Sequence, residues 1–182
     1  MFYEADHKFM DMTKKFRYIL LAFIGLLGSS APALSQSQVE RELENMVMTA
    51  VEKYNDRDFE AAQDILSDVV EADPSADAAW YYLGMLALYD ADTVLAEEYF
   101  RKAIQLDPGN FWYRYRLAKM YLYTSREVAI DMYEKLMDDF PKKSDLYFEM
   151  VELYIAEQEY EKALQTIYEI ENVFGPTEGL AV

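Results

Sequence analysis

The sequence has 182 residues, enough for one ordinary domain, and its 52% hydrophobic and 28% charged residues are typical of a folded globular protein. The formal net charge at pH 7 is −17, and from residue 36 onward 13 basic residues stand against 31 acidic ones. Such a surface repels phosphate backbones and anionic lipids, which disfavours both nucleic-acid binding and polybasic attachment to a membrane.

The N-terminus has the pattern of an export signal. Lys14, Lys15 and Arg17 precede the apolar run of residues 18–27, and small residues follow in the stretch GSSAPALSQ. This apolar run is shorter than the roughly 20 residues that a membrane-spanning helix needs. We therefore expect an exported protein, located in the periplasm, and the alternative is a protein anchored in the membrane by an uncleaved N-terminal helix.

Residues 1–35 are predicted to be the signal peptide. The small residues favour cleavage after Ala33 or after Ser35, which places the start of the mature chain near Gln36. Met12 is a more ordinary start for such a signal than the charged residues that precede it. No stable membrane insertion is expected after cleavage.

Few chemically reactive side chains are available. The sequence has no cysteine, which excludes disulfides and a lipid-modified cysteine at the cleavage point. The single histidine, His7, lies in the segment that export would remove. Ser-His-Asp and Cys-His nucleophiles, the usual zinc sites and imidazole bases are then unavailable. We expect no enzyme activity, no cofactor and no metal.

Apolar residues recur at three- and four-residue steps beyond residue 36, which predicts a series of amphipathic helices. The predicted helices span residues 38–55, 58–72, 76–89, 92–106, 110–123, 126–139, 144–157 and 160–173. Equivalent residues return after 33 or 34 positions, namely Ala62, Ala96, Ala129 and Ala163, and Pro74, Pro108 and Pro141. A helical hairpin is therefore repeated, and repeats of this length stack into a solenoid. The single 33-residue interval is accommodated by a deletion in the turn near Thr124 and Ser125.

The segment WYYLGMLALYDADTVLAEEYFRKAIQLDP, residues 80–108, carries the most regular of these repeats. Its Trp, Leu-Gly, Ala, Phe and Pro spacings resemble the tetratricopeptide repeat pattern, with Ala87 in place of the usual tyrosine. The other units are more degenerate. The resemblance implies an all-α fold, a right-handed α-solenoid of about four antiparallel hairpins over residues 36–176. The approximate units are 41–74, 75–108, 109–141 and 142–175.

In this best-matching unit, small residues stand where two antiparallel helices must come close. We expect Gly84 and Ala96 to set the helix separation, while Pro108 blocks helix continuation and ends the unit. Asp90 and Asp92 have the spacing of a calcium loop, but the glycine and the distal glutamate of such a loop are missing. Asp92 is predicted to be an N-cap instead.

The resemblance implies that peptides or partner helices bind along a concave side lined by the first helix of each hairpin. These helices carry a largely aromatic stripe at equivalent repeat positions. The predicted partner-binding residues are Tyr81, Met85, Leu88, Tyr89, Trp112, Tyr115, Lys119, Leu122, Tyr123 and Phe148. Family members that capture a C-terminal carboxylate place several cations and asparagines in these columns, and Lys119 alone is present here. The alternative is that the aromatic residues pack against neighbouring first helices or against a segment missing from this chain.

Residues 177–182 are expected to be a tail or the start of a missing continuation. The sequence GPTEGLAV after Phe174 is too short to form the terminal covering element that a solenoid needs. Either a partner covers the last hairpin, or this chain is the front of a longer protein.

We therefore predict an exported, acidic, all-α repeat protein that binds another protein or a peptide and performs no chemistry itself. One alternative is a self-assembling structural array, which leaves a homo-oligomer open. Another is the docking arm of a longer enzyme or assembly factor.

Overall fold

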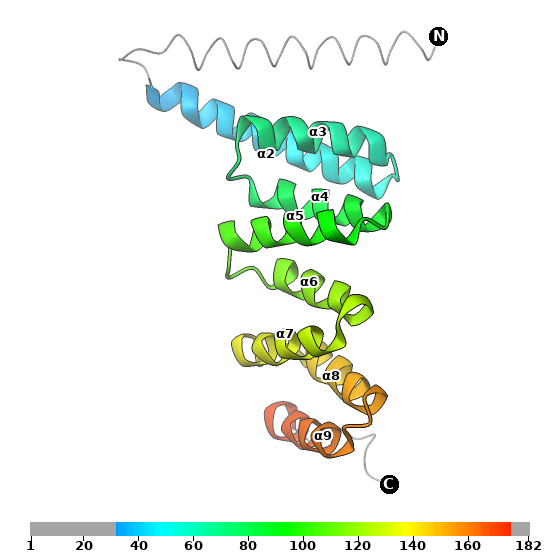
Figure 1. Cartoon of the computed structure of the whole chain (residues 1–182). Coiled ribbons are helices and arrows are strands. Elements are labelled where there is room, and N and C mark those ends of the chain that lie inside the picture. Colours follow the sequence, from blue (N-terminus) through cyan, green and yellow to red (C-terminus); the bar gives the residue numbers. More distant parts are fainter. Residues whose placement is uncertain (1–31, 176–182) are drawn as a thin grey trace. The chain divides into compact units, whose positions relative to one another are not determined.

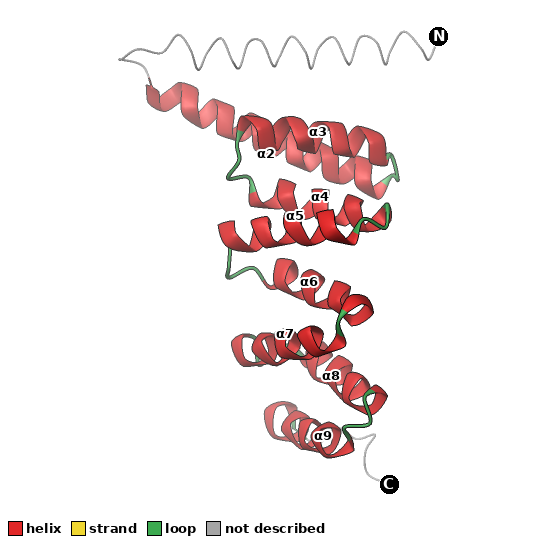
Figure 2. Cartoon of the chain, in the orientation of Figure 1, coloured by secondary structure: helices red, strands yellow, loops and turns green. Residues whose placement is uncertain are grey.

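The computed structural model describes residues 32–175, and this part of the chain consists of eight α-helices joined by short turns, with no strand (Figures 1 and 2). The helices are α2 (Pro32–Asn55), α3 (Phe59–Ala72), α4 (Asp77–Tyr89), α5 (Thr93–Leu106), α6 (Phe111–Thr124), α7 (Arg126–Asp139), α8 (Ser144–Ala156) and α9 (Tyr160–Phe174). They divide into two compact units, of which the first ends at Asp90 and the second begins at Ala91. The first unit holds α2 to α4 and the second α5 to α9.

The predicted helices agree with these bounds to within one residue, except at the beginning of α2. This helix begins at Pro32 rather than at residue 38. Proline is well tolerated in the first turn because its missing N–H has no intrahelical acceptor there. The predicted cleavage positions after Ala33 and Ser35 therefore fall in the first turns of α2. The rest of the predicted signal, with Met12, and the predicted tail at 177–182 lie outside the described residues.

Consecutive helices pack as antiparallel hairpins within each unit. In the first unit α2 packs on α3 and α3 on α4, and in the second α5 packs on α6, α6 on α7, α7 on α8 and α8 on α9. The small repeated alanines Ala62, Ala96 and Ala129 are fully buried, as their spacing predicts. Gly84 is also buried, in α4. None of the helices within residues 32–175 is long and apolar enough to cross a membrane.

The turns that contain Pro74 and Pro141 join one hairpin to the next. In each turn a backbone N–H donates to the carbonyl three residues earlier. Ala76 donates to Asp73 at 3.1 Å, and Lys143 donates to Phe140 at 3.0 Å. Proline fits the second position of such a turn because its φ is fixed near the required value. The indole N–H of Trp80 also donates to the Pro74 carbonyl at 3.0 Å, which ties α4 to the turn before it.

The turns inside the hairpins have a different geometry. Arg57 and Gln158 adopt positive φ values of 64° and 61°, each just after a helix end. The next N–H reaches back to the carbonyl five residues earlier, from Asp58 to Lys53 and from Glu159 to Tyr154. This is the Schellman arrangement, which satisfies the free carbonyls of a helix C-terminus. The α6–α7 turn is shorter, with Ser125 as its single residue, as the 33-residue interval predicts.

Candidate functional site

The ten predicted partner-binding residues lie on the first helices of the hairpins, four on α4 in the first unit and six on α6 and α8 in the second. On α4, Tyr81, Met85 and Leu88 are half-buried and Tyr89 is exposed. The Tyr89 ring lies 4.2 Å from the ring of Phe59 on α3. The α4 residues therefore form a partly packed surface of their own unit.

In the second unit, three of the predicted residues have largely exposed aromatic rings. Trp112 is 56% exposed, Tyr123 89% and Phe148 46%. We call Trp112, Tyr123 and Phe148 the aromatic surface. Leu122 instead packs against the buried core of this unit, which includes Tyr133, Leu136, Met150 and Tyr154.

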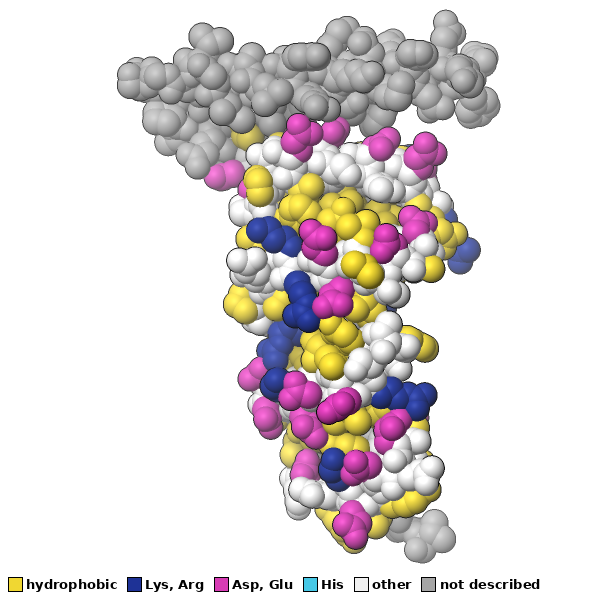
Figure 3. Space-filling view, in the orientation of Figure 1, with side chains coloured by type: hydrophobic (Ala, Val, Ile, Leu, Met, Phe, Trp, Pro, Cys, Tyr) yellow, Lys and Arg dark blue, Asp and Glu magenta, His cyan; other side chains and the backbone are white. Residues whose placement is uncertain are grey.

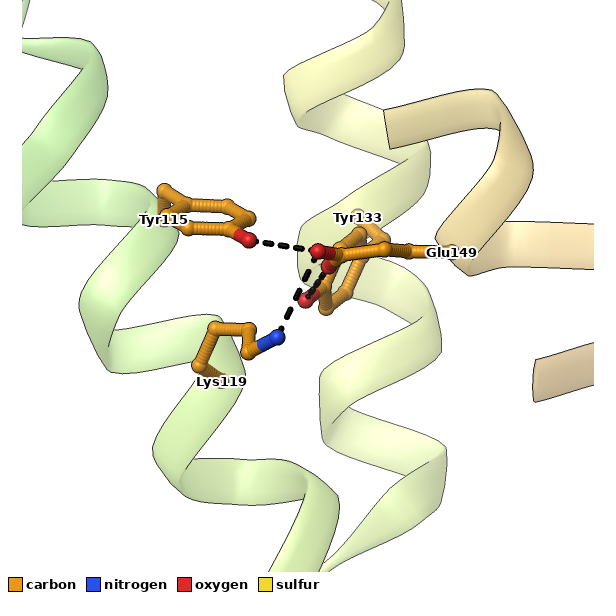
Figure 4. Close-up of polar contacts among 4 residues, drawn as sticks. All are labelled: Tyr115, Lys119, Tyr133 and Glu149. Carbon is orange, nitrogen blue, oxygen red and sulfur yellow. Dashed lines mark hydrogen bonds and ion pairs between the residues drawn. The ribbon is translucent and has the colours of Figure 1, made fainter. Parts of the chain in front are cut away.

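Glu149 on α8 is the centre of a polar cluster that sequence analysis missed (Figure 4). Its Oε1 accepts a hydrogen bond of 2.6 Å from the Tyr115 hydroxyl on α6, and its Oε2 accepts one of 2.6 Å from the Tyr133 hydroxyl on α7. The Lys119 Nζ on α6 lies 3.3 Å from Oε1. Three helices are therefore joined through one carboxylate, which we call the Glu149 cluster.

The Glu149 cluster shifts the pKa values of its members in opposite directions. Burial alone would raise the pKa of Glu149, but the hydrogen bonds from Tyr115 and Tyr133 and the charge of Lys119 outweigh it, so this pKa is lowered. Burial and the hydrogen bonds to the Glu149 carboxylate raise the pKa of both tyrosines. At neutral pH the cluster therefore holds an ionised carboxylate between two neutral hydroxyls and an ammonium group.

Tyr115 and Lys119 have a different environment from the aromatic surface. The Tyr115 ring is stacked at 5.3 Å on Phe111 and lies 6.1 Å from the Tyr133 ring. The Lys119 ammonium is paired with Glu149 and lies 5.6 Å from the centre of the Tyr115 ring. These two predicted binding residues are thus engaged in contacts between helices, as the packing alternative for the stripe describes.

Lys143, at the beginning of α8, adds a cation beside the aromatic surface. Its Nζ lies 4.6 Å from the Phe111 ring centre and 5.5 Å from that of Trp112. An ammonium group over aromatic faces is held by the ring quadrupoles. Lys143 follows Pro141 by two residues, so the repeat pattern places it in a turn and gives no sign of this contact.

Sequence signals for the Glu149 cluster exist, but they are indirect. Tyr133 follows Phe100 by 33 residues and so occupies the same repeat position, whereas Glu149 is the residue after Phe148, the repeat equivalent of Tyr115. Phe100 is fully buried, and the same position in the third hairpin carries a hydroxyl that needs an acceptor. A tyrosine at a buried repeat position, with a carboxylate in the following first helix, was the available signal.

In the α4–α5 turn, Asp92 has the structural role that was predicted for it. Asp92 Oδ1 accepts a hydrogen bond of 3.0 Å from the Leu95 backbone N–H, so Asp92 is confirmed as the N-cap of α5. Among the described residues, no group of three or more histidine, cysteine or acidic side chains is arranged to hold a metal ion.

Comparisons with known proteins give one family match and several solved structures of similar fold. Residues 47–111 match the model of the tetratricopeptide repeat family. No curated protein sequence matches the chain. Three solved structures illustrate the similarity in fold.

An O-GlcNAc transferase from Thermobaculum terrenum is 21% identical with a TM-score of 0.56, and the match covers 62% of this chain and 22% of that one. MamA from Desulfovibrio magneticus RS-1, from its residue 41 to the end, is 16% identical with a TM-score of 0.61, covering 90% and 95% of the two chains. The first repeat domain of Spaghetti (RPAP3), bound to an HSP90 peptide, is 14% identical with a TM-score of 0.59, covering 65% and 94%. These likenesses concern the fold, and they confirm the predicted all-α helical solenoid.

Proposed function

We propose that this chain, which carries tetratricopeptide repeats, is a protein-interaction scaffold that binds a peptide or a partner helix on the aromatic surface. The observation that carries this proposal is the exposure of Trp112, Tyr123 and Phe148 on the first helices of two successive hairpins. Large rigid rings provide contact area with few rotatable bonds, and aromatic residues are enriched among the residues that dominate binding energy. The peptide-bound RPAP3 domain supports a ligand of this class.

The Glu149 cluster and Lys143 support the same proposal. Glu149 holds Tyr115 and Lys119 on α6, and the Tyr115 ring lies 6.1 Å from the Trp112 ring, so one ring of the aromatic surface has a fixed neighbour before binding. A preorganised surface loses less side-chain entropy on association. Lys143, whose Nζ lies over the Trp112 ring, is positioned to donate a hydrogen bond to an acidic or other polar group of the partner.

A peptide selection tests this function. The whole chain is immobilised and challenged with a random peptide library displayed on phage. Selected peptides are expected to lose about tenfold or more in affinity when Trp112 or Tyr123 is replaced by alanine, because exposed aromatic anchors carry most of the binding energy. The matched control is Val94→Ala, because Val94 is equally apolar and 79% exposed but lies on α5, a second helix. Peptides that bind all three variants equally would place the site elsewhere.

We also propose that the protein is exported and carries out no chemistry itself. The support is the basic, apolar and small-residue order of residues 14–35 and the lack of cysteine and histidine after His7. Intact-mass measurement of the protein made in its own cells should give an N-terminus at Leu34 or Gln36. A mass that retains residues 14–33, in a membrane fraction, would instead favour an anchor.

A further inference from the structure

α9, the last helix of the described residues, has the same repeat positions as the row of α7 that another helix covers. Three side chains on successive turns of α7 face α8. Two of them contact α8 or its C-terminal end, and the third packs in the core to which α8 contributes. Arg126 pairs with Glu157 at 2.7 Å, and Ile130 packs against the buried core. Glu134 accepts a hydrogen bond of 2.7 Å from the Tyr154 hydroxyl. This row of α7 is therefore the surface on which the next first helix lies.

The same row on α9, 34 residues later, is apolar and exposed. Tyr160, Leu164 and Tyr168 stand at the positions of Arg126, Ile130 and Glu134 and are 60%, 56% and 64% exposed. They are spaced by four residues, so they lie along one face of the helix. We call them the α9 surface. Figure 3 shows hydrophobic and acidic side chains side by side at this end of the chain.

Acidic side chains border the α9 surface. Glu171 is three residues beyond Tyr168, and Glu161 is three residues before Leu164, so both lie on the same side of the helix. Both are exposed, and neither carboxylate forms a hydrogen bond or an ion pair with any described residue. Lys162, the single basic residue of α9, is paired with Glu159 at 3.2 Å. An apolar row with unpaired carboxylates along it favours an apolar partner that carries positive charge.

We propose that the α9 surface docks an amphipathic helix of another protein, with an apolar row toward Leu164 and Tyr168 and lysine or arginine residues along its edges. The helical form follows from the equivalent row of α7, which is covered by the helix α8. This is a second binding surface, on a different helix from the aromatic surface, and it goes beyond the proposed function.

A second copy of the chain fits the α9 surface less well. Two α9 helices related by a two-fold axis at the level of residue 166 would bring Leu164 of one copy against Tyr168 of the other. The same symmetry would place Glu161 of each copy beside Glu171 of its partner. Like charges in direct opposition disfavour such a pair, whereas a basic helix neutralises both carboxylates.

The test uses two hydrocarbon-stapled peptides and the whole chain. The first probe has the sequence of α8, SDLYFEMVELYIA, with Asp145→Lys, Glu149→Lys and Glu152→Lys, because α8 is the helix that covers α7. The second probe is the unaltered, acidic α8 sequence. Fluorescence anisotropy is expected to show the lysine probe binding about tenfold or more tightly than the acidic one, because only the former complements the carboxylates.

Variants of the chain locate the contact. The double variant Leu164→Ser with Tyr168→Ser should weaken the lysine probe about tenfold or more, and Glu161→Gln with Glu171→Gln should reduce the preference for lysine over acid. Val94→Ser, on α5, and Trp112→Ala, on the aromatic surface, should leave binding unchanged. Circular dichroism melts confirm that each variant is folded, which is expected because the changed side chains are exposed.

Three results would overturn the proposal. They are equal binding of the two probes, undiminished binding of the lysine probe to the Leu164 and Tyr168 double variant, and no binding of the lysine probe to the wild-type chain. Sedimentation equilibrium adds a fourth, because a doubled mass that the double variant abolishes would assign the α9 surface to a second copy. Loss of the phage-selected peptides in Trp112→Ala concerns the aromatic surface alone, whereas loss of the lysine probe in that variant would also overturn this proposal.

Discussion

Tyr115 and Glu149, 34 residues apart, join the first helices of two successive hairpins through a hydrogen bond of 2.6 Å. Tyr133 completes the contact from the second helix between them, with its own 2.6 Å bond to the same carboxylate. The ring of Tyr115 also stacks on Phe111. Tyr115, a predicted binding residue, is therefore held both by its ring and by its hydroxyl group. The apolar stacking of the hairpins in the second unit is thus supplemented by a specific polar contact.

Glu149→Gln should destabilise the chain by about 1 to 3 kcal/mol, because an amide accepts fewer hydrogen bonds than a carboxylate and leaves donors of the Glu149 cluster unsatisfied. Urea denaturation at neutral pH measures the effect. Glu152→Gln is the control, because Glu152 lies on the same helix, is exposed and makes no hydrogen bond with a described residue. A change equal to that of the control would show that the cluster adds nothing to stability.

The effect of Glu149 should also depend on pH. Its pKa is lower in the folded chain than the ordinary value, so its stabilising contribution is fully present above the unfolded pKa of about 4.3 and is lost as the pH falls through the folded pKa. The stability difference between wild type and Glu149→Gln should therefore be largest at neutral pH and shrink below about pH 4. A difference that stays constant down to that pH would contradict an ionised carboxylate in the cluster.

Tyr115 and Tyr133 should ionise late in an alkaline titration followed by phenolate absorbance. Burial and the neighbouring Glu149 carboxylate raise the pKa of both hydroxyls above the ordinary tyrosine value of about 10. Because a raised folded pKa favours the neutral form, stability should fall as the pH rises above about 10. Tyr115→Phe with Tyr133→Phe should remove two late-titrating groups from the curve, and an unchanged curve would contradict the raised pKa values.

Tyr115 and Tyr123 should respond differently to truncation although both belong to the predicted stripe. Tyr123→Ala should change the free energy of unfolding by less than about 0.5 kcal/mol, because its side chain is almost fully exposed. Tyr115→Ala should cost roughly 2 kcal/mol or more, through the lost ring packing and the lost hydrogen bond. Denaturation midpoints decide this, and equal costs for the two variants would contradict the described environments.

Asp92→Ala should lower stability by about 1 kcal/mol, because the Leu95 N–H at the start of α5 loses its acceptor. Thermal denaturation gives the comparison. Asp90→Ala is the control from the same turn, since it is exposed and its side chain makes no hydrogen bond with a described residue. If Asp90→Ala is as destabilising as Asp92→Ala, the cap is not the cause.

The helices could be predicted almost to the residue because each repeat carries its own boundaries. Buried alanines such as Ala62 and Ala129 fix the hairpin register, and Pro74 and Pro141 mark the turns between hairpins. The early beginning of α2 was not predictable from the repeat, since Pro32 precedes the first repeat unit. Repeat spacing therefore predicted the helix bounds, and the prediction failed only at the beginning of α2, where no equivalent repeat position exists for comparison.

The candidate site was less predictable, for a physical reason. Repeat spacing places Tyr115, Tyr123 and Phe148 on first helices, but it gives no measure of how far each ring is covered. The Tyr115 hydroxyl is hydrogen-bonded to Glu149, a residue that the sequence alone would assign to the solvated surface. Whether a charge on a helix faces water or a neighbouring hairpin depends on the packing between units, which is a tertiary property.

The left-handed residues Arg57 and Gln158 point to where this repeat could be made more stable. A left-handed conformation costs an ordinary residue roughly 1 to 2 kcal/mol, and glycine avoids that cost while losing about 0.4 to 1 kcal/mol through the greater freedom of its unfolded chain. Arg57→Gly and Gln158→Gly should thus give small net gains. The α6–α7 turn offers no such gain, because its 33-residue repeat omits the left-handed residue altogether. The lengths of the repeats therefore separate the turns that glycine can relax from the one that has no left-handed residue.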